Sequence, residues 1–375
     1  MAEINYNITS LIDFLGLIQG VILGIVLIIG NRKNRPSLFL GLFLITFSTE
    51  LISVILEDTN LIDLYPTLLF LPTNFTFLSL VLFFLYAKSV MSNLEKRDYW
   101  FLSLGVIEFI VFTVLFCFPA SAKISMMEKW NLSLLLVFYE LLFLGWFLFF
   151  LIKTLRLVRK HRLEIENYFS DIQNRKLRWI KWAIYYQLFY LGFIIISVSF
   201  LTTRFETIVY SVISVLNVGF IYGVGIYGLR QPRVEMPITE NSSKVEKEIQ
   251  LKEKTVIKVE KIDDLEQLYQ DLLHVMQTEK PFKNAELNLT DLAQLTQMPI
   301  KKLSHLINLK AEVNFNTFIN QYRIEEAKEM LIDAEFNHLN VVGIGYEVGF
   351  NSKATFYNVF KKMTNTTPAK FKKNV

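Results

Sequence analysis

The chain has two regions with different patterns of hydrophobic and polar positions. From residue 10 to residue 228, apolar residues form seven long runs that are separated by shorter polar connections. A run of about 20 apolar residues can cross the hydrocarbon core of a bilayer as a helix. The pattern therefore predicts seven transmembrane helices, at residues 10–30, 37–56, 67–88, 101–119, 132–153, 183–202 and 208–228.

The pattern changes after residue 230. Residues 231–261 are rich in Lys, Glu, Ser and Thr, a composition typical of a solvated linker. From Ile262 onward, apolar positions recur every three or four residues, as they do in amphipathic helices. We therefore expect an all-α chain with three parts: a seven-helix membrane bundle at 1–230, a charged linker at 231–261 and a helical domain at 262–375.

Composition agrees with a membrane region. Hydrophobic residues make up 52% of the chain, which is high for a soluble protein. The N-terminus has no basic segment, and the first apolar run is long for a secretion signal, so we expect a retained helix. The single cysteine, Cys117, excludes an intrachain disulfide.

The charges between the apolar runs predict the orientation of the bundle. Lys and Arg are enriched in cytoplasmic loops, and fifteen of them follow the first, third and fifth runs, against three in the opposite connections. We expect a multi-pass protein of the cell (inner) membrane, with the N-terminus outside and the C-terminal domain in the cytoplasm. The fifteen are Arg32, Lys33, Arg35, Lys88, Lys96, Arg97, Lys153, Arg156, Arg159, Lys160, Arg162, Arg175, Lys176, Arg178 and Lys181, and the three are Lys123, Lys129 and Arg204.

Glu50, Glu108 and Glu140 are carboxylates that lie inside the predicted spans. A charged carboxylate at the bilayer centre costs about 2.5–3.5 kcal/mol on insertion scales, so such a group faces the bundle interior, is paired or is protonated. Signal sensing and purely structural hydrogen bonding between helices are equally open roles. Polar residues in neighbouring runs are Asn74, Gln187 and Asn217.

The connection at 154–182 is long and basic. Within it, Ser170-Asp-Ile-Gln173 is a capping-box pattern, which predicts the start of a helix. The basic residues fit contact with lipid headgroups; the alternative is a surface that contacts the cytoplasmic domain.

The C-terminal region contains two helix-turn-helix patterns that are joined by a long helix at 316–333. In the first pattern, Pro299 marks the turn and suits the first position of the second helix. In the second pattern, Gly349 permits a tight turn, Phe350 fills the core, and Asn351 or Ser352 caps the following helix. The residues expected to face DNA are Lys301, Lys302, Ser304 and His305 in the first pattern and Lys353, Tyr357, Asn358, Lys361 and Lys362 in the second.

Residues 262–375 resemble the DNA-binding domain of AraC-type transcription regulators. The resemblance implies that the two recognition helices enter successive major grooves on one face of the DNA. The N-terminal region resembles, more weakly, the seven-helix sensor regions that are fused to such regulators, through Tyr168-Phe-Ser-Asp171 and Leu177-Arg-Trp179. The C-terminal resemblance rests on Leu289, Leu292-Ala293, Leu303-Ser304, Tyr322-Arg-Ile324, Ala327-Lys328, Leu331, Tyr346-Glu-Val-Gly-Phe-Asn-Ser352, Phe356, Phe360-Lys-Lys362 and Thr367-Pro368.

The same resemblance implies base contacts. His305, beside Lys301, and Asn358 stand where the family often has an arginine. Arginine suits guanine and asparagine suits adenine, so these departures imply a different preferred sequence.

These features favour a membrane-anchored, sequence-specific DNA-binding transcription regulator whose bundle senses a signal. The alternatives are a transporter or membrane enzyme with an appended DNA-binding module, and a regulator whose membrane part is only an anchor. We expect no enzyme activity, cofactor or metal, because the sequence has no P-loop, no H-E-x-x-H and no kinase nucleotide motif. The expected partners are double-stranded DNA, the lipid bilayer and RNA polymerase, with a second copy of the chain and an unidentified ligand or membrane partner as further candidates.

Overall fold

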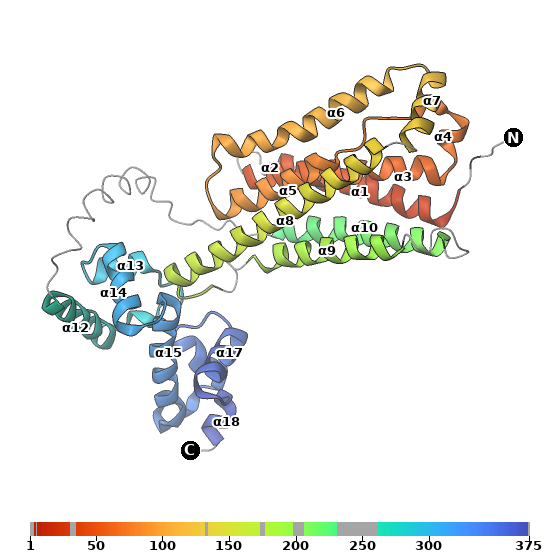
Figure 1. Ribbon diagram of the computed structural model, residues 1–375. Helices are drawn as coiled ribbons and strands as arrows, with labels where there is room; N and C mark the ends of the chain where they lie inside the picture. Colours follow the sequence, from red (N-terminus) through yellow and green to blue (C-terminus); the bar gives the residue numbers. More distant parts are fainter. Residues whose placement is uncertain are drawn as a thin grey trace. The chain divides into compact units, whose positions relative to one another are not determined.

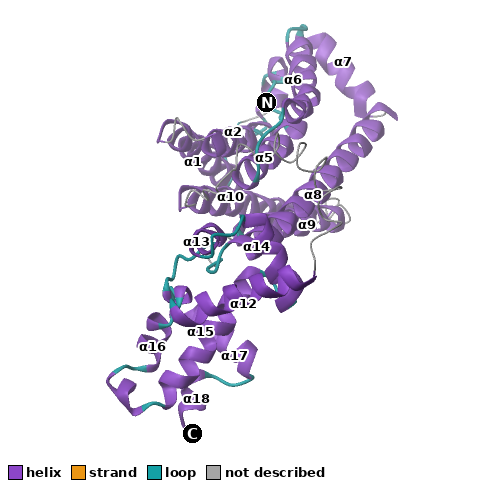
Figure 2. Ribbon diagram, turned by 90° about the vertical axis from the view of Figure 1, so that its left-hand side faces the viewer, coloured by secondary structure: helices purple, strands orange, loops and turns teal. Residues whose placement is uncertain are grey.

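The computed structural model describes residues 4, 6–30, 35–131, 134–172, 177–197, 206–230 and 262–373. The described residues form helices and no strand, apart from one isolated antiparallel bridge between Phe169 and Asn288 (Figures 1 and 2). The prediction of an all-α chain is confirmed.

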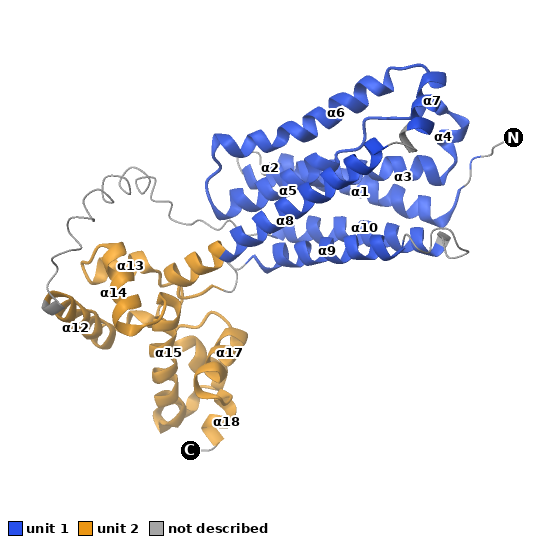
Figure 3. Ribbon diagram, in the orientation of Figure 1, with its two compact units in different colours: residues 1–159, 177–234 blue, residues 160–176, 235–375 orange. Residues whose placement is uncertain are grey.

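The chain divides into two compact units (Figure 3). The first comprises Met1–Arg159 and Leu177–Val234, and the second comprises Lys160–Lys176 and Glu235–Val375. The predicted linker at 231–261 lies outside the described residues, as do the basic residues Arg32, Lys33, Arg175, Lys176 and Arg204. The domain boundaries at 230 and 261 stay predictions.

The first unit contains the apolar helices. Among the described residues, six helical segments are long and apolar enough to cross a membrane: Ile8–Gly30, Arg35–Asp58, Lys96–Phe116, Leu134–Tyr168, Arg178–Ser197 and Ile208–Arg230. The helices of this unit are α1 (Ile8–Gly30), α2 (Arg35–Thr49), α3 (Leu51–Asp58), α4 (Leu61–Leu64), α5 (Thr76–Met91), α6 (Leu102–Phe116), α7 (Ala120–Asn131), α8 (Leu134–Tyr168, whose end belongs to the second unit), α9 (Arg178–Ser197) and α10 (Glu206–Arg230).

The third predicted span differs from the observed helix. The run 67–88 predicts one continuous helix, but α5 begins only at Thr76. Residues Pro66–Leu68 form a 3-10 helix, and Phe70 has a positive φ of 60°. Pro72 lacks a backbone N–H and interrupts a helix at this point. The remaining 16 residues of α5 rise only about 24 Å, less than the bilayer core of about 30 Å.

Small residues let α1 pack closely against its neighbours. A Cβ atom on Gly24 would lie 2.7 Å from the carbonyl oxygen of Gly41 in α2, and one on Gly16 would lie 2.5 Å from a methyl carbon of Val218 in α10. Such close approach of apolar helices gains van der Waals contact that a larger side chain would prevent. The three glycines, Gly16, Gly20 and Gly24, recur every fourth residue and therefore lie on one face of α1.

The second unit has two apolar cores that share α15. The first core gathers α12, α13, α14 and the start of α15, and includes the buried side chains Leu272, Leu292 and Leu303. The second gathers the rest of α15 with α16 and α17, around Phe356 and Phe360. The helices are α12 (Ile262–Thr278), α13 (Leu289–Leu295), α14 (Ile300–Leu306), α15 (Phe315–Ile332), α16 (Val341–Glu347), α17 (Lys353–Thr364) and α18 (Pro368–Lys373).

Capping side chains fix where these helices begin. Asn288 caps α13 in a reciprocal capping box with Asp291, and Ser352 caps α17 by accepting a hydrogen bond from the Thr355 amide. Pro299 is the N-cap of α14 and not its first helical residue, so the predicted position was wrong by one residue. Asn288 and Ser352 satisfy backbone donors that the first turn of a helix leaves unpaired, whereas Pro299 makes no side-chain capping hydrogen bond.

Candidate DNA-binding surface

The two predicted recognition helices, α14 and α17, are each the second helix of a helix-turn-helix unit. In the first helix-turn-helix unit, Leu303 and Leu306 are buried and hold α14 in the core. In the second, a Cβ atom on Gly345 of α16 would lie 2.6 Å from the ring of Phe356 in α17. Each recognition helix is therefore fixed by its apolar side, and its opposite side carries exposed residues.

The turn before α17 requires a glycine. Gly349 has a φ of +97°, and a Cβ atom there would lie 2.3 Å from the carbonyl oxygen of Phe282. The next residue, Phe350, is 2% exposed. The turn of the second helix-turn-helix unit thus packs against the loop that precedes the first helix-turn-helix unit. Only a residue without a side chain permits this approach.

The nine predicted DNA-facing residues are all exposed or half-buried. The structure exposes Lys301 and His305 on α14, whereas Lys302 and Ser304 are half-buried. On α17, Tyr357 is half-buried and lies under Lys353, whose Nζ is 5.7 Å from the ring centre. The exposed residues of α17 are Lys353, Asn358, Lys361 and Lys362. Their contact with DNA stays a prediction.

Sequence reasoning missed the role of Arg323. This side chain is only 1% exposed, although arginine is almost never fully buried unless it is paired. Its Nε donates to the carbonyl oxygen of Phe282 at 2.7 Å, and Nη2 donates to that of Asn284 at 2.8 Å. Burial lowers the pKa of the guanidinium to about 10, which still leaves it charged at neutral pH. The sequence signals were an arginine among the apolar positions of the predicted helix at 316–333 and its place in the Tyr322-Arg-Ile324 stretch that carries the family resemblance.

Comparison with known proteins agrees with this geometry. A family model described as a helix-turn-helix domain matches residues 292–374. The C-terminal part of this chain carries an AraC-type helix-turn-helix domain. No solved structure matches the chain.

Three curated relatives share short segments with the chain. An "HTH-type transcriptional regulator in cgkA 5′ region" of Pseudoalteromonas carrageenovora is 42% identical over 65 residues, which are 17% of this chain and 36% of that protein. The "Probable transcription factor PqrA" of Proteus vulgaris is 39% identical over 57 residues, 15% of this chain and 44% of that protein. "Histidine kinase P4" of Formosa agariphila is 32% identical over 99 residues, 24% of this chain and 7% of that protein. The chain therefore spans less than half the length of each of these relatives.

The end of α8 is packed into the unit that holds the AraC-type domain. Ser170 does not start a helix, as its capping-box pattern predicted, but lies in a bend after α8. Its hydroxyl donates to the carbonyl oxygen of Leu287 at 2.6 Å and accepts a hydrogen bond from Arg323 at 3.1 Å. The capping oxygen is thus used by tertiary contacts, and Gln173 lies outside the described residues.

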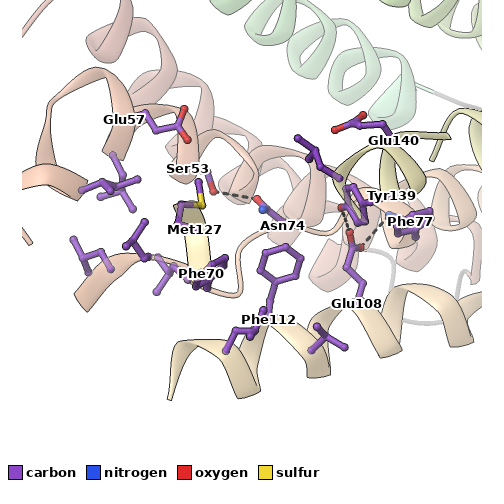
Figure 4. A pocket seen from close by; sticks show the side chains of 18 of the residues that line it. Ser53, Glu57, Phe70, Asn74, Phe77, Glu108, Phe112, Met127, Tyr139 and Glu140 are labelled. Carbon is purple, nitrogen blue, oxygen red and sulfur yellow. Dashed lines mark hydrogen bonds between the residues drawn. The ribbon is translucent and has the colours of Figure 1, made fainter. Parts of the chain in front are cut away.

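The candidate signal-sensing residues line two cavities of the first unit. Glu108, which is 6% exposed, accepts hydrogen bonds from the Tyr139 hydroxyl at 2.7 Å and the Phe77 amide at 3.1 Å. It lines a cavity of about 560 Å³ together with Glu57 and Glu140 (Figure 4). Glu140 is exposed. Sequence reasoning did not single out Glu57, which lies near the end of its apolar run.

Glu50 lines the second cavity, which measures about 520 Å³. It accepts a hydrogen bond from the Ser79 hydroxyl at 3.0 Å. Gln187 and Asn217, the polar residues of two later runs, line the same cavity, and Ser53, Glu57 and Asn74 line both cavities. The structure therefore brings together polar residues from predicted spans that are far apart in the sequence.

Proposed function

We propose that the chain is a membrane-anchored, sequence-specific DNA-binding transcription regulator, and that its bundle senses a signal. The proposal rests on the combination of two recognition helices with exposed basic and polar faces and, in the described part of the chain, six helices long and apolar enough to cross a membrane. Basic side chains neutralise phosphates, whereas His and Asn side chains can read base edges in the major groove.

The segment shared with the histidine kinase does not favour an enzyme. It amounts to 7% of that protein, too little to carry a kinase activity over to this chain. We propose that the protein is not an enzyme and acts by occupying DNA, with RNA polymerase as the partner that reads this occupancy.

The two cavities support the sensing role. Each has a volume in the range of ligand sites, about 300–1,000 Å³, and combines apolar walls with a few polar groups. We propose that Glu50, Glu108 and Glu140 take part in recognising the signal, because carboxylates inside membrane segments are costly and rare and commonly mark ligand or ion sites.

We expect DNA binding by the full chain in lipid nanodiscs to depend steeply on salt. If roughly five phosphates are neutralised by the lysines of α14 and α17, the logarithm of the binding constant falls against log salt with a slope near −4.5. Replacing Lys361 and Lys362 with alanine should reduce this slope by about one unit per lysine, whatever the DNA sequence. Replacement of Lys283, which pairs with Glu326 at 2.7 Å, is the matched control. Affinity that does not change with salt would contradict the proposal.

Substitution of the exposed polar residues should change sequence preference. We expect His305→Ala and Asn358→Ala each to cost about 1–3 kcal/mol on the preferred DNA, at one base position each, because a base contact is lost. Selection from a random duplex pool by the nanodisc-embedded chain measures this effect. An equal loss on all sequences would show that these side chains touch only the backbone.

The topology can be tested with reporter fusions. Fusions after Lys96 and Arg162 should score as cytoplasmic, and fusions after Asp58 and Lys123 should score as external, because basic loops stay inside. The pair Asp58 and Lys96 is decisive, since α5 between them is shorter than a usual span. If both fusions score on the same side, α5 does not cross the membrane and the predicted orientation is wrong.

A further inference from the structure

The end of α8 forms part of the second unit through apolar and polar contacts. We define residues 165–172 as the docked segment. Its apolar side chains Ile165, Phe169 and Ile172 are buried at 0%, 5% and 7% exposure. Residues Lys160–Lys176 group with the AraC-type domain, whereas the earlier part of α8 belongs to the first unit. One helix therefore supplies residues to both units.

The docked segment is bound through its backbone to the first helix-turn-helix unit. The Ser170 amide donates a hydrogen bond to the carbonyl oxygen of Leu287 at 3.2 Å, next to the antiparallel bridge between Phe169 and Asn288. The side-chain amide of Asn316 on α15 donates to the carbonyl oxygens of Ser170 and Phe169, at 2.5 and 3.3 Å. These backbone contacts define the register of the docked segment.

The segment also reaches the residue at which the two helix-turn-helix units meet. Arg323 lies on α15, and its guanidinium donates hydrogen bonds to the carbonyl oxygens of Phe282 and Asn284, beside the first helix-turn-helix unit. The same guanidinium lies 5.5 Å from the ring centre of Phe350 in the second helix-turn-helix unit. Ser170 accepts the remaining described hydrogen bond of Nη2 at 3.1 Å. Ser170 therefore helps to hold the side chain that connects the two helix-turn-helix units.

A second polar contact links the docked segment to the residue before α17. The Asn351 side-chain amide donates to Asp171 at 2.9 Å and to Glu286 at 2.8 Å. Asn351 directly precedes Ser352, the cap of the recognition helix α17. Asp171 thus lies at the start of the second recognition helix. The hydroxyl of Tyr168 shares a hydrogen bond with the hydroxyl of Thr290 in α13 of the first helix-turn-helix unit.

We propose that the docked segment holds the two helix-turn-helix units in one relative orientation, and that the bundle regulates DNA binding by strengthening or releasing this hold. The proposal rests on the proposed function of the chain as a DNA-binding regulator. Two recognition helices that read one site must keep a fixed spacing, since successive major grooves lie about 34 Å apart. A change in α8 acts on Ser170 and Asp171 first, because they follow its last residue, Tyr168.

Double electron–electron resonance, which measures the distance between two spin labels, tests the proposal on the full chain in nanodiscs without DNA. Spin labels replace Leu295 on α13 and Tyr346 on α16, which are 44% and 53% exposed and are not among the DNA-facing residues, in a background with Cys117→Ser. We expect one narrow distance peak in this background. The double substitution Ser170→Ala, Asp171→Ala should add a second, broader population.

The matched control is Asn167→Ala, an exposed position of the same segment, which should keep the single peak. If the double substitution lowers hydrogen-exchange protection throughout α15, the comparison is made with Ser170→Ala alone, which removes one hydroxyl. An unchanged distance distribution in the folded variants would overturn the proposal and make the segment a simple attachment.

Selection from a random duplex pool separates this proposal from the function on which it rests. The parent chain should enrich paired half-sites at one spacing, and the double variant should enrich the same half-sites at several spacings. Equal spacing in both proteins would contradict the docked segment's role, whereas failure of the parent chain to enrich any sequence would contradict the proposed function itself.

Discussion

Replacing Gly349 with alanine is expected to destabilise the second helix-turn-helix unit by about 2–6 kcal/mol. Two effects add. A side chain at a φ of +97° costs of order 1–3 kcal/mol in backbone strain. The new Cβ atom would also lie 2.3 Å from the Phe282 carbonyl oxygen, and overpacking of this kind typically costs about 1–3 kcal/mol. Hydrogen exchange of the α16 and α17 amides in the full chain measures the loss.

The chain offers a matched control for this substitution. Gly343 lies in α16, and a Cβ atom there would meet no atom closer than 3.6 Å. Since alanine favours a helix over glycine by about 1 kcal/mol, Gly343→Ala should stabilise the same unit slightly. Equal protection in both variants would mean that the turn at Gly349 is not held as the structure shows.

Replacement of the membrane bundle is expected to have the largest effect on function. If the bundle senses a signal, its two packings bind that signal with different affinity, and the population shifts by no more than this difference. A coupling free energy of about 1–3 kcal/mol changes occupancy of a promoter roughly 5- to 150-fold. Exchange of residues 1–159 and 177–230 for an unrelated anchor that keeps residues 160–176 should therefore remove the response to growth conditions.

The readout is transcription of a target gene across growth conditions. Expression that becomes fixed, either high or low, agrees with a sensing bundle, and Glu50→Gln, Glu108→Gln and Glu140→Gln are then the first single substitutions to compare. A response that survives the exchange unchanged would show that the bundle is only an anchor.

Much of the fold could be predicted because periodicity reports burial. Apolar positions recur every three or four residues from Ile262 onward, and Leu272, Met276, Leu303 and Leu306 at that spacing are buried. Turn chemistry was equally informative at Gly349, since glycine adopts its φ of +97° without the strain that a side chain would bring. Local rules succeed where a residue's environment is set by its own helix.

One failure was a local turn signal that hydrophobicity alone does not weigh, and the other arose from tertiary contacts. The third apolar run contains enough hydrophobic residues for a span, but the turns around Phe70 and Pro72 shorten its helix. Ser170 has the sequence of a helix cap, yet Arg323 and the Leu287 carbonyl use its hydroxyl. No local pattern predicts a partner more than 100 positions away.

The candidate sites show the same division. The exposed faces of α14 and α17 follow from helical spacing alone. The sequence also predicted that Glu50, Glu108 and Glu140 face the interior, are paired or are protonated, because a charged carboxylate in the bilayer is costly. Glu108 is buried and accepts a hydrogen bond from Tyr139, whereas Glu140 is exposed. That these glutamates line two cavities with shared residues such as Asn74 depends on the packing of several helices, which the sequence does not specify.

The central claim is that one chain is embedded in the membrane and occupies specific DNA. Crosslinking in living cells, isolation of the membrane fraction and sequencing of DNA recovered with the intact chain test it directly. We predict enrichment of a small number of discrete sites that share a bipartite sequence, and loss of this enrichment when Lys361 and Lys362 are replaced with glutamate. Recovery of the intact chain with no DNA enriched over the variant, or recovery of the DNA-bound chain only outside the membrane fraction, would contradict the claim.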